Sequence, residues 1–531
     1  MTQAFVHIPM GTPLPQLPHA ISVSIPTWKE TWDYKRDECN PKMLDRFETG
    51  YPRYFIHRSI EKLARICEAQ FGSPSETSLL IASRRAAEAC RDFLTVRKVS
   101  SRVISLRVQD AHFTALFFNP ESYDTARLFW ELTGLGVSSR CADQCLESIA
   151  KDPASLQVYT DSTTNGHTGM AKEGEQAKAA VRHRISGLLS QSSTTTVADT
   201  DVFLYPTGMS AVWFSHQLCL GALGERPSVC FGFPYTDTLK ILHNWCSDDL
   251  AFYPDGSEAS IDRLEELLAA RHAENPSIPP ILALFTELPS NPLLRSVNLP
   301  RLRKLANQYD FVIVVDETVG NFANVDILPY TDIIASSLSK TFSGAGNVMG
   351  GSLVLNPAGK HYTRLSEHIR ETYEDLWFSA DAIVMEQNSR DFAERMRAVS
   401  DNAAAVAHLL RDAHPIITEV FYPEWQTTEL YNACRRPGAG YGGLFSLHFV
   451  SPACARAFYD TLPCAKGPSF GTNFTLACFY TVLAHYYELE WAEGLGVGAD
   501  LVRISIGLED REEMLGAFKS ALEAARKAYE A

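Results

Sequence analysis

The sequence has 531 residues, of which 45% are hydrophobic and 21% are charged, and its formal net charge is −15. A chain of this size and composition is expected to form two or three domains with a large core. The negative net charge argues against a nucleic-acid partner, and no apolar segment is long enough to span a bilayer. The first residues lack the basic start and apolar core of a secretory signal, so we expect a cytoplasmic protein without a membrane partner.

The twelve cysteines are scattered along the chain and lie mostly inside apolar segments, as at Cys67, Cys219 and Cys478. This distribution is typical of reduced core thiols rather than of a disulfide framework. Cys141 and Cys145 have no matching second pair, so we expect no metal site.

Residues 1–57 show few helical patterns and are expected to form an extended arm. Such an arm usually packs on another surface, and we predict that this surface belongs to a neighbouring subunit. Residues 58–200 mix helical and strand-like patterns with a polar stretch rich in serine and threonine, and we expect an inserted α/β region and linker. Its strands are expected near 78–82 and 103–108, and its helices near 125–135, 141–150 and 174–189.

Residues 201–390 alternate strands and helices regularly. The strands are expected near residues 202–206, 229–232, 281–286, 311–316, 333–337 and 351–355. Continuous apolar strands separated by helices predict a mainly parallel sheet flanked by helices on both faces. Residues 391–531 begin with a long amphipathic helix and contain a strand of alternating polarity, 444–450. We therefore predict an α/β fold with a mainly parallel central sheet, followed by an α+β C-terminal domain.

Lys340 follows the apolar strand near 333–337, in the stretch Ser337-Leu338-Ser339-Lys340. A buried ammonium group is costly unless it is paired, whereas a lysine that condenses with an aldehyde forms a Schiff base. Ser337 and Ser339 alternate along the strand, so both hydroxyls can face one phosphate. A phosphate beside a Schiff-base lysine indicates pyridoxal 5'-phosphate (PLP) as the cofactor. The alternative is a surface lysine in a serine-rich turn.

Other candidate residues fall at strand ends, where open parallel sheets bind their ligands. Gly208 and Met209 begin a helix directly after a strand, where backbone amides and the helix dipole bind phosphate. Asp316 ends the most apolar strand, where a carboxylate is costly unless paired. A pyridinium nitrogen would pair with it, and the ring would become an electron sink. The alternatives are an ordinary tight turn at Gly208 and a salt bridge or helix cap at Asp316.

Three further residues suit the same cofactor and an amino-acid substrate. Asn291, in a polar turn, could donate to the phenolate oxygen of PLP, and Tyr235 could stack on the ring. Arg503 lies inside an apolar strand, and its planar guanidinium suits two-pronged binding of a substrate carboxylate. The alternatives are a proline-rich turn, a core tyrosine and an internal salt bridge.

Taken together, these residues resemble the Cys/Met-metabolism PLP enzymes of fold type I. Within that family the chain is most similar to fungal cystathionine γ-synthases and their relatives in secondary metabolism. The resemblance runs from about residue 19 to the C-terminus. Its motifs lie at 49–53, 207–211, 231–235, 287–292, 315–318, 337–340, 347–351, 467–473 and 503–509.

The resemblance implies a role for each candidate residue around the cofactor. Lys340 would bind PLP and move protons, and Tyr235 would stack on the ring and assist proton transfer. Asp316 would pair with the pyridine nitrogen, and Asn291 would contact the phenolate oxygen. The residues implied to hold the phosphate within the chain are Ser337, Ser339, Gly208 and Met209.

The resemblance also implies a shared active site. Tyr51 and Arg53 would reach the phosphate of a neighbouring subunit, in a homodimer or homotetramer. Arg503, helped by Ser469, would bind the α-carboxylate of the small amino-acid substrate. Residues 60–200 separate the Tyr51 motif from the Gly208 motif, and neither the pattern nor the resemblance gives them a role beyond scaffold or assembly.

The implied reaction is γ-substitution on an O-acyl-L-homoserine, with acetyl or succinyl as the acyl group. Loss of the α-proton, a β-proton and the acyloxy group would leave a vinylglycine ketimine, to which a nucleophile adds at Cγ. Cysteine would give cystathionine. Residues 342–347 carry small apolar residues where the methionine-pathway enzymes are expected to hold an acid, which puts cysteine in doubt. Relatives in secondary metabolism use a carbon nucleophile, such as a β-keto acid, or an amine.

Two other functions stay open at this point. One is a lyase of the same family that performs β- or γ-elimination on sulfur amino acids. The other is a non-catalytic relative that keeps the fold as a binding module. The joint presence of Lys340, Asp316, Arg503, Tyr51 and Arg53 argues against the module.

Overall fold

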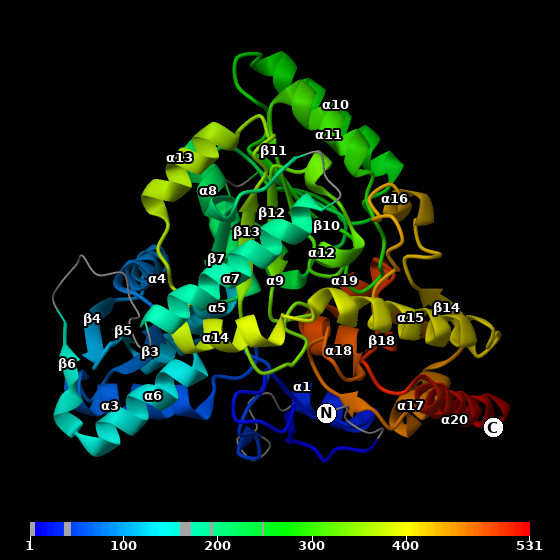
Figure 1. The fold of residues 1–531 in the computed structure, drawn as a ribbon, viewed down its shortest axis with the longest axis horizontal. Coiled ribbons are helices and arrows are strands. Elements are labelled where there is room, and N and C mark those ends of the chain that lie inside the picture. Colours follow the sequence, from blue (N-terminus) through cyan, green and yellow to red (C-terminus); the bar gives the residue numbers. More distant parts are fainter. Residues whose placement is uncertain (1–5, 37–43, 160–170, 192–194, 247–248) are drawn as a thin grey trace.

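The computed structural model describes residues 6–36, 44–159, 171–191, 195–246 and 249–531, arranged in four sheets with helices around them (Figure 1). The largest sheet has seven strands in the order β7-β13-β12-β11-β10-β8-β9. They are β7 (Val202–Tyr205), β8 (Val229–Phe231), β9 (Ala251–Tyr253), β10 (Ala283–Glu287), β11 (Val312–Asp316), β12 (Ile333–Ser337) and β13 (Gly351–Leu355). All neighbouring strands are parallel except β13, which runs antiparallel to both β12 and β7.

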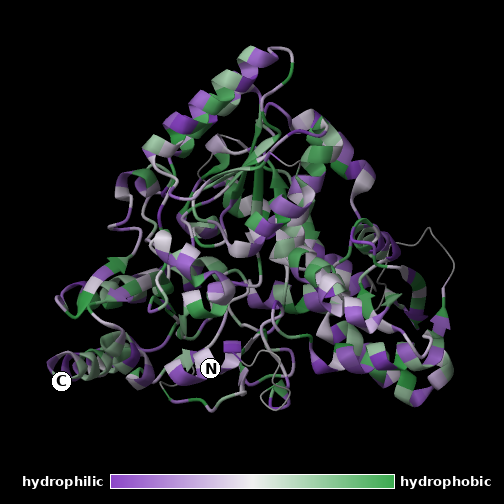
Figure 2. Cartoon of the chain, turned by 180° about the vertical axis from the view of Figure 1, so that it is seen from behind, coloured by the Kyte–Doolittle hydropathy of each residue, from purple (hydrophilic) through white to green (hydrophobic). Residues whose placement is uncertain are grey.

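Two separate cores cover the two faces of this sheet. Along β11, Ile313 and Val315 pack into one core, whereas Val312 and Val314 pack into the other. Because side chains alternate along a strand, a strand that is buried on both faces is apolar throughout, and Figure 2 shows this run of hydrophobic residues in the centre of the molecule. The helices and short 3-10 turns of this part are η3 (Asp199–Asp201), α8 (Gly208–Leu223), α9 (Thr236–Trp245), α10 (Glu258–Glu274), α11 (Leu299–Tyr309), α12 (Asn321–Asn324), η4 (Leu328–Tyr330), α13 (Tyr362–Thr372) and α14 (Ser379–Asn388).

The region before the central sheet has its own antiparallel sheet, in the order β3-β5-β4-β6. Its elements are α3 (Arg58–Phe71), β3 (Thr77–Ile81), α4 (Arg84–Val96), β4 (Ser101–Val108), β5 (Ala111–Phe118), η1 (Pro120–Ser122), α5 (Tyr123–Thr133), α6 (Ser139–Lys151), η2 (Pro153–Ser155) and β6 (Leu156–Val158). The helix α7 (Ala171–Ser190) then packs along α14. We refer to residues 58–158 as the inserted domain.

The C-terminal part forms a five-stranded sheet in the order β14-β15-β18-β17-β16, antiparallel except between β16 and β17. Its elements are α15 (Phe392–Arg411), β14 (Ile417–Phe421), α16 (Thr428–Asn432), β15 (Leu444–Phe449), α17 (Pro452–Thr461), β16 (Ala465–Lys466), β17 (Leu476–Phe479), α18 (Tyr480–His485), η5 (Tyr486–Glu488), α19 (Leu489–Gly494), β18 (Val502–Ser505) and α20 (Arg511–Glu530). The predicted α/β fold with an α+β C-terminal part is therefore confirmed. The boundaries at residues 57, 200 and 390 stay a prediction.

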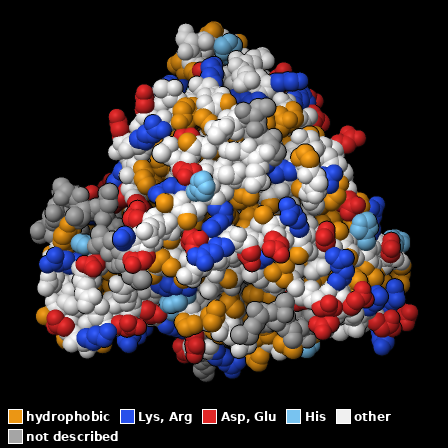
Figure 3. Space-filling model, viewed as in Figure 1, with side chains coloured by type: hydrophobic (Ala, Val, Ile, Leu, Met, Phe, Trp, Pro, Cys, Tyr) orange, Lys and Arg blue, Asp and Glu red, His pale blue; other side chains and the backbone are white. Residues whose placement is uncertain are grey.

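The N-terminal arm lies against both the central part and the C-terminal part of its own chain. It contains β1 (Pro13–Leu14), β2 (Ser22–Val23) and α1 (Trp28–Arg36). The backbone amide of Ile25 donates to the carbonyl of Lys466 at 2.8 Å, and that of Ile21 donates to the carbonyl of Gly346 at 2.9 Å. In Figure 3, hydrophobic side chains gather in the lower middle of the molecule, where Figure 1 places the arm, and acidic and basic side chains are interspersed elsewhere on this face. Within the ranges described above, no helix is long and apolar enough to cross a membrane.

Candidate active site

A cavity of about 200 Å³ opens at the carboxyl end of the central sheet, and it is lined by all parts of the chain. The arm, the inserted domain, the strand ends of the central sheet and the C-terminal part each contribute to its wall. This is the place where open parallel sheets bind ligands. Each of the twelve site residues that the sequence indicated lines this cavity: Tyr51, Arg53, Gly208, Met209, Tyr235, Asn291, Asp316, Ser337, Ser339, Lys340, Ser469 and Arg503.

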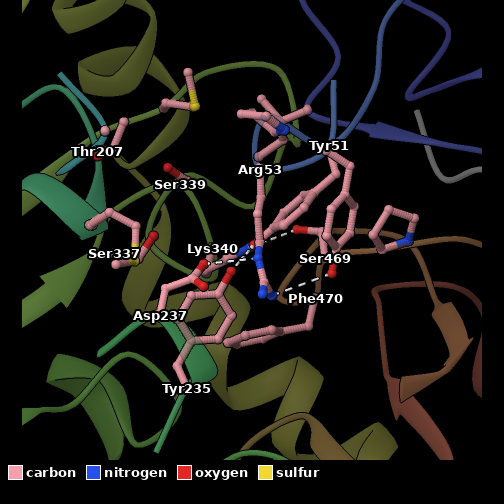
Figure 4. A pocket seen from close by; sticks show the side chains of 18 of the residues that line it. Tyr51, Arg53, Thr207, Tyr235, Asp237, Ser337, Ser339, Lys340, Ser469 and Phe470 are labelled. Atoms are coloured by element: carbon pink, nitrogen blue, oxygen red, sulfur yellow. Dashed lines mark hydrogen bonds and ion pairs between the residues drawn. The ribbon is translucent and has the colours of Figure 1, made fainter. Parts of the chain in front are cut away.

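Lys340 lies just beyond the end of β12 and is only 8% exposed, so the alternative of a surface lysine is wrong. Its Nζ donates to the Oγ of Ser469 at 2.9 Å and to the hydroxyl of Tyr51 at 3.3 Å (Figure 4). The Nζ also lies 4.8 Å from the ring centre of Tyr51 and 5.1 Å from that of Phe470. The amine is thus held in place by hydroxyls and aromatic faces, a setting that suits a reactive amine.

Asp316 ends β11 and pairs in register with Glu287 at the end of the neighbouring β10. Burial raises the pKa of Asp316, against the opposing effects of hydrogen bonds from Thr318 and of the Lys340 charge. Burial, followed by the charge of Asp316, raises the pKa of Glu287 well above its ordinary value. Two neighbouring buried carboxyl groups cannot both ionise cheaply, and the larger upward shift favours the proton on Glu287 over Asp316.

Glu287 is a site residue to which the sequence pattern gave no role. Its carboxyl oxygens accept from the backbone amides of Tyr235 and of Asn291, the latter at 3.3 Å. It therefore fixes the backbone of both residues beside the cavity. The sequence shows an acid at this strand end, but its role becomes clear only from the two backbone amides that it accepts from.

The turn before α8 forms a cradle for an anion. Thr207 caps the helix, because its Oγ1 accepts from the amide of Ser210 at 3.0 Å. A Cβ added to Gly208 would lie 2.6 Å from the Cβ of Ser337, so only glycine allows the helix to begin this close to β12. The first amides of the helix and the Ser337 side chain therefore face one another (Figure 4), and such a helix start binds phosphate. Ser339 differs, because its Oγ accepts from the amide of Gly350 at 3.0 Å and donates to the Gly350 carbonyl at 3.3 Å.

Tyr51 and Arg53 enter the cavity of their own chain. Within this chain the Arg53 Nε lies 2.9 Å from the Asp237 Oδ2, and the Tyr51 hydroxyl lies 3.4 Å from that of Tyr235. The neighbouring Tyr54 hydroxyl donates to the Leu483 carbonyl at 2.8 Å. The contact of the arm with a neighbouring subunit stays a prediction.

The two tyrosines have opposite pKa shifts. Burial alone would raise the pKa of Tyr51, but the charge of Lys340 and hydrogen bonds from Tyr235 and Lys340 outweigh it and bring the pKa below the ordinary value. Burial, followed by the charges of Tyr51 and Asp237, raises the pKa of Tyr235 well above the ordinary value. Of the two hydroxyls, Tyr51 is therefore the one that contacts Lys340 and loses its proton more readily, although the sequence pointed to Tyr235 for proton transfer.

Arg503 projects from β18 and is 6% exposed. Its Nη1 donates to the Oδ1 of Asn291 at 3.0 Å, and its Nη2 donates to the Ser469 carbonyl at 2.6 Å. Both of these acceptors are neutral, which argues against the alternative of an internal salt bridge and leaves the positive charge for a ligand carboxylate. Ser469 has a φ of +97°, a rare conformation for a residue other than glycine, and it contacts Lys340 and Arg503 at once.

The inserted domain supplies a wall that the sequence did not indicate. Trp130, Glu131, Gly136 and Val137 line the cavity from the end of α5 and the following loop. Gly134, in the same loop, has a φ of +62°, and a Cβ there would lie 2.0 Å from the Thr207 Oγ1. Gly134 and Gly136 after a helix indicate a turn in the sequence, but the packing of this turn against Thr207 depends on tertiary structure.

Comparisons with known proteins give the family of this chain. Residues 260–523 match the family model described as Cys/Met metabolism PLP-dependent enzyme, and residues 59–138 match fungal trans-sulfuration enzyme, N-terminal domain. The chain is 42% identical to the cystathionine gamma-synthase-like enzyme iboG2 of Amanita muscaria, over 98% of this chain and 97% of the relative. The chain belongs to the Cys/Met-metabolism PLP-dependent enzymes.

Two further comparisons place the chain within this PLP-dependent family. It is 35% identical to the cystathionine gamma-synthase of Neurospora crassa, over 98% of each protein. A crystal structure of cystathionine gamma synthase from Xanthomonas oryzae pv. oryzae matches with a TM-score of 0.55 and 21% identity, over 70% of this chain and 92% of that one, which shows the shared fold. The chain is therefore a PLP-dependent enzyme of the cystathionine γ-synthase type with fold type I.

The residues on the wall fit PLP. Gly208 leaves space beside Ser337 that a Cβ would fill. Among the contacts above, the buried Lys340 amine has only hydroxyl groups as hydrogen-bond partners. Asp316 lies close enough to Lys340 for the lysine charge to oppose the rise in its pKa that burial causes. A phosphate site, an amine and a carboxylate thus share one cavity. This is the donor set that an aldehyde, a phosphate and a pyridine nitrogen on one molecule require.

Proposed function

We propose that this enzyme catalyses γ-substitution on an O-acyl-L-homoserine, with a carbon nucleophile such as a β-keto acid adding at Cγ. The observation that carries the proposal is the position of Ser469 between Lys340 and Arg503. A substrate whose α-carboxylate binds Arg503 is held beside the amine of Lys340 because one residue contacts both. The family match supports γ-substitution in general, and the acyl donor and nucleophile are the proposed parts.

Several residues of the chain are proposed to bind PLP. Gly208, Met209, Ser337 and Arg53 are proposed to hold the phosphate of PLP, and Asp316 to hold its pyridine nitrogen in the protonated form. Bound PLP supplies an electron sink that stabilises negative charge on substrate carbon atoms. Tyr235 is proposed to lie against the ring, with its backbone fixed by Glu287.

Lys340 is proposed to carry protons between the substrate's carbon atoms. It lies beside Ser469 on the side of Arg503, and beside Tyr51 on the side of the arm. The lowered pKa of Tyr51 supports a role as the partner that takes or returns the proton of Lys340. The pKa of a general base works best when it lies near the operating pH, and the shift of Tyr51 is in that direction.

The cavity wall supports the proposed nucleophile. The segment 341–348, in which the sequence carries small apolar residues, contributes none of the described residues that line the cavity. The wall of the inserted domain adds the indole of Trp130 and the side chains of Ile60 and Val137. An apolar wall favours a nucleophile with an apolar body over cysteine with its charged ammonium group.

The test is product analysis. The enzyme is incubated with O-acetyl-L-homoserine or O-succinyl-L-homoserine and with cysteine, a β-keto acid or an amine in turn, and products are identified by mass. A carbon–carbon bonded product that is absent with Lys340→Ala is expected. Cystathionine as the main product would contradict the proposed nucleophile. Ammonia and a keto acid from the acyl-homoserine alone would indicate the eliminating alternative instead.

A further inference from the structure

A tyrosine that the sequence did not indicate lies next to Arg503 in the wall of the cavity. Tyr480 begins α18 directly after β17, and its side chain is 3% exposed. We propose that Tyr480 is a further substrate-binding residue, whose hydroxyl donates a hydrogen bond to the substrate α-carboxylate that Arg503 is proposed to bind. The proposal rests on the proposed role of Arg503 and is independent of which acyl group and which nucleophile the enzyme uses.

The sheet of the C-terminal part places Tyr480 beside Arg503. In the antiparallel pair β17–β18, Cys478 lies opposite Arg503, and the hydrogen-bond ladder continues past the end of β17, since the amide of Tyr480 donates to the Leu501 carbonyl at 3.3 Å. Side chains alternate along a strand, and Cys478 and Tyr480 pack in one core whereas Phe479 packs in another. Cys478, Tyr480 and Arg503 therefore point to the same face of the sheet, and all three line the cavity.

Two aromatic rings hold the guanidinium of Arg503 in place. Its Cζ lies 4.8 Å from the ring centre of Tyr480 and 5.3 Å from that of Phe470. Cation–π contacts within about 6 Å are attractive, and unlike a carboxylate partner they leave the positive charge of the guanidinium uncompensated. Together with the neutral acceptors Asn291 and Ser469, the two rings orient Arg503 without neutralising it.

The hydroxyl of Tyr480 is a buried group without a hydrogen-bond partner in the part of the chain that the structure describes. Tyrosine hydroxyls usually find a partner when they are buried, and a buried polar group that stays unpaired destabilises the fold. Tyr422 shows the usual arrangement in this chain, since it is fully buried and its hydroxyl donates to the Gly442 carbonyl at 3.1 Å. An unpaired hydroxyl in a cavity wall is typical of a group that binds a ligand.

The surroundings of this hydroxyl make it a hydrogen-bond donor to an anion. Burial raises the pKa of Tyr480, against the opposing effect of the Arg503 charge, so the phenol keeps its proton at neutral pH. Hydrogen bonds to ionised acceptors are the stronger ones, and a guanidinium beside the phenol suits a carboxylate. In Figure 4, Ser337 of the phosphate cradle and Ser469 lie on opposite sides of Lys340, which separates this carboxylate from the phosphate of PLP.

The pairing of Tyr480 with Arg503 predicts how strictly the enzyme requires a free carboxylate. The amide of an amino acid would leave the Arg503 charge and the Tyr480 hydroxyl buried without an anionic partner. Sites built to hydrogen-bond a ligand group reject analogues that lack it far more strongly than apolar pockets reject a change of shape. Tyr480 is therefore expected to add to the preference for free α-amino acids over their amides.

The first experiment compares ligands with and without the carboxylate. The holoenzyme is titrated with L-norvaline, which has no leaving group at Cγ, and with L-norvalinamide, and the change in visible absorbance of the cofactor gives each Kd. Tyr480→Phe is expected to raise the Kd for L-norvaline about tenfold, the effect of losing one hydrogen bond to a charged group, and to leave the Kd for the amide unchanged. An unchanged Kd for L-norvaline, or an equal rise for both ligands, would overturn the proposal.

Tyr422→Phe is the matched control, because it removes a hydroxyl that is already paired and lies outside the cavity. The thermal midpoint of unfolding should fall in Tyr422→Phe and should stay at the wild-type value or rise in Tyr480→Phe, whereas only Tyr480→Phe should change the Kd for L-norvaline. A midpoint that falls equally in both variants would assign the Tyr480 hydroxyl a structural partner and overturn the proposal. Since L-norvaline needs neither an acyl group nor a nucleophile, failure of the proposed γ-substitution leaves these readouts intact.

The second experiment asks whether both residues bind one carboxylate. Tyr480→Phe, which keeps the aromatic face, is combined with Arg503→Lys, and the Kd for L-norvaline is measured for the wild type, both single variants and the double variant. Groups that bind the same ligand atom pair are coupled, so the rise in Kd of the double variant should be smaller than the product of the two single rises. Rises that simply multiply would place the hydroxyl on another part of the ligand and contradict the proposal.

Discussion

The Nζ of Lys340 lies 2.9 Å from the Oγ of Ser469. Since the Ser469 carbonyl accepts from Arg503, this contact connects the amine that is proposed to transfer protons with the guanidinium that is proposed to hold the substrate carboxylate. Ser469 keeps this position with a φ of +97°. Local strain of this kind persists where the surrounding structure over-determines it, and here Ser469 contacts both Lys340 and Arg503.

Lys340→Ala is expected to remove the visible absorbance of the bound cofactor and to lower kcat by about 10²–10⁴-fold, the usual contribution of a positioned acid–base group. Absorbance spectra and turnover with O-acetyl-L-homoserine measure the two effects. Ser469→Ala is the comparison, because it removes one hydrogen bond to Lys340 and keeps the amine. A Lys340→Ala enzyme with wild-type absorbance would contradict the assignment.

Arg503→Ala is expected to raise the KM for the acyl-homoserine by about 10–100-fold, because a hydrogen bond to a charged group contributes about 1.5–3 kcal/mol. The KM of Arg503→Lys is expected to lie between those of the wild type and Arg503→Ala, since lysine keeps the charge but not the planar guanidinium. Steady-state kinetics at saturating nucleophile separate KM from kcat. PLP absorbance serves as the control and should not change, whereas an unchanged KM would remove Arg503 from the substrate site.

The two serines after β12 are expected to behave differently. Ser337→Ala should weaken PLP binding about tenfold, because its side chain faces the open start of α8. Ser339→Ala should leave PLP affinity closer to that of the wild type and should lower the free energy of unfolding by ~1 kcal/mol, because its hydroxyl pairs with the Gly350 backbone. Fluorescence titration with PLP and thermal denaturation distinguish the pair, and the reverse ranking would show that Ser339 holds the phosphate.

Much of this site could be predicted from the sequence, because strand-end chemistry is local. The apolar runs before Asp316 and Lys340 gave both strands, and a charged residue directly after such a run is costly unless it has a partner. The glycine of the Gly208 turn was likewise visible as a helix start after a strand. Each of these inferences needs only a few consecutive residues.

The remaining parts depend on contacts between distant segments. In this chain the turn that carries Tyr51 contacts Arg127, 76 residues further on, and Leu483 in the C-terminal part. The strand β5 was also missed, because Gln109 and Asp110 connect it tightly to β4, with a positive φ of 52° at Gln109, and no glycine or proline marks the turn. Propensity does not identify such a hairpin.

Glu287 is expected to make the free energy of unfolding depend on pH. Its pKa in the folded state lies well above the ordinary 4.5, so the folded protein binds more protons than the unfolded chain above that pH. The free energy of unfolding should therefore fall as pH rises from 4.5 toward the raised pKa, and Glu287→Gln, which stays neutral, should flatten this slope. Thermal midpoints at several pH values in this window test it, with Glu88→Gln on the exposed helix face as control. An equal slope in Glu287→Gln and wild type would show that Glu287 is ionised in the folded state.

Trp130→Ala is expected to change how the enzyme treats its nucleophile. The indole lines the cavity from the inserted domain and covers Gly136, so its loss removes part of the apolar wall without touching Lys340 or Arg503. The KM for a β-keto acid should rise several-fold, because its apolar body loses contact with the indole and apolar burial contributes about 25 cal/mol per Å², while the KM for the acyl-homoserine stays constant. Competition between a β-keto acid and cysteine in one reaction measures the shift in preference. A change confined to the KM for the acyl-homoserine would show that Trp130 contacts that substrate, and that the nucleophile does not bind against the inserted domain.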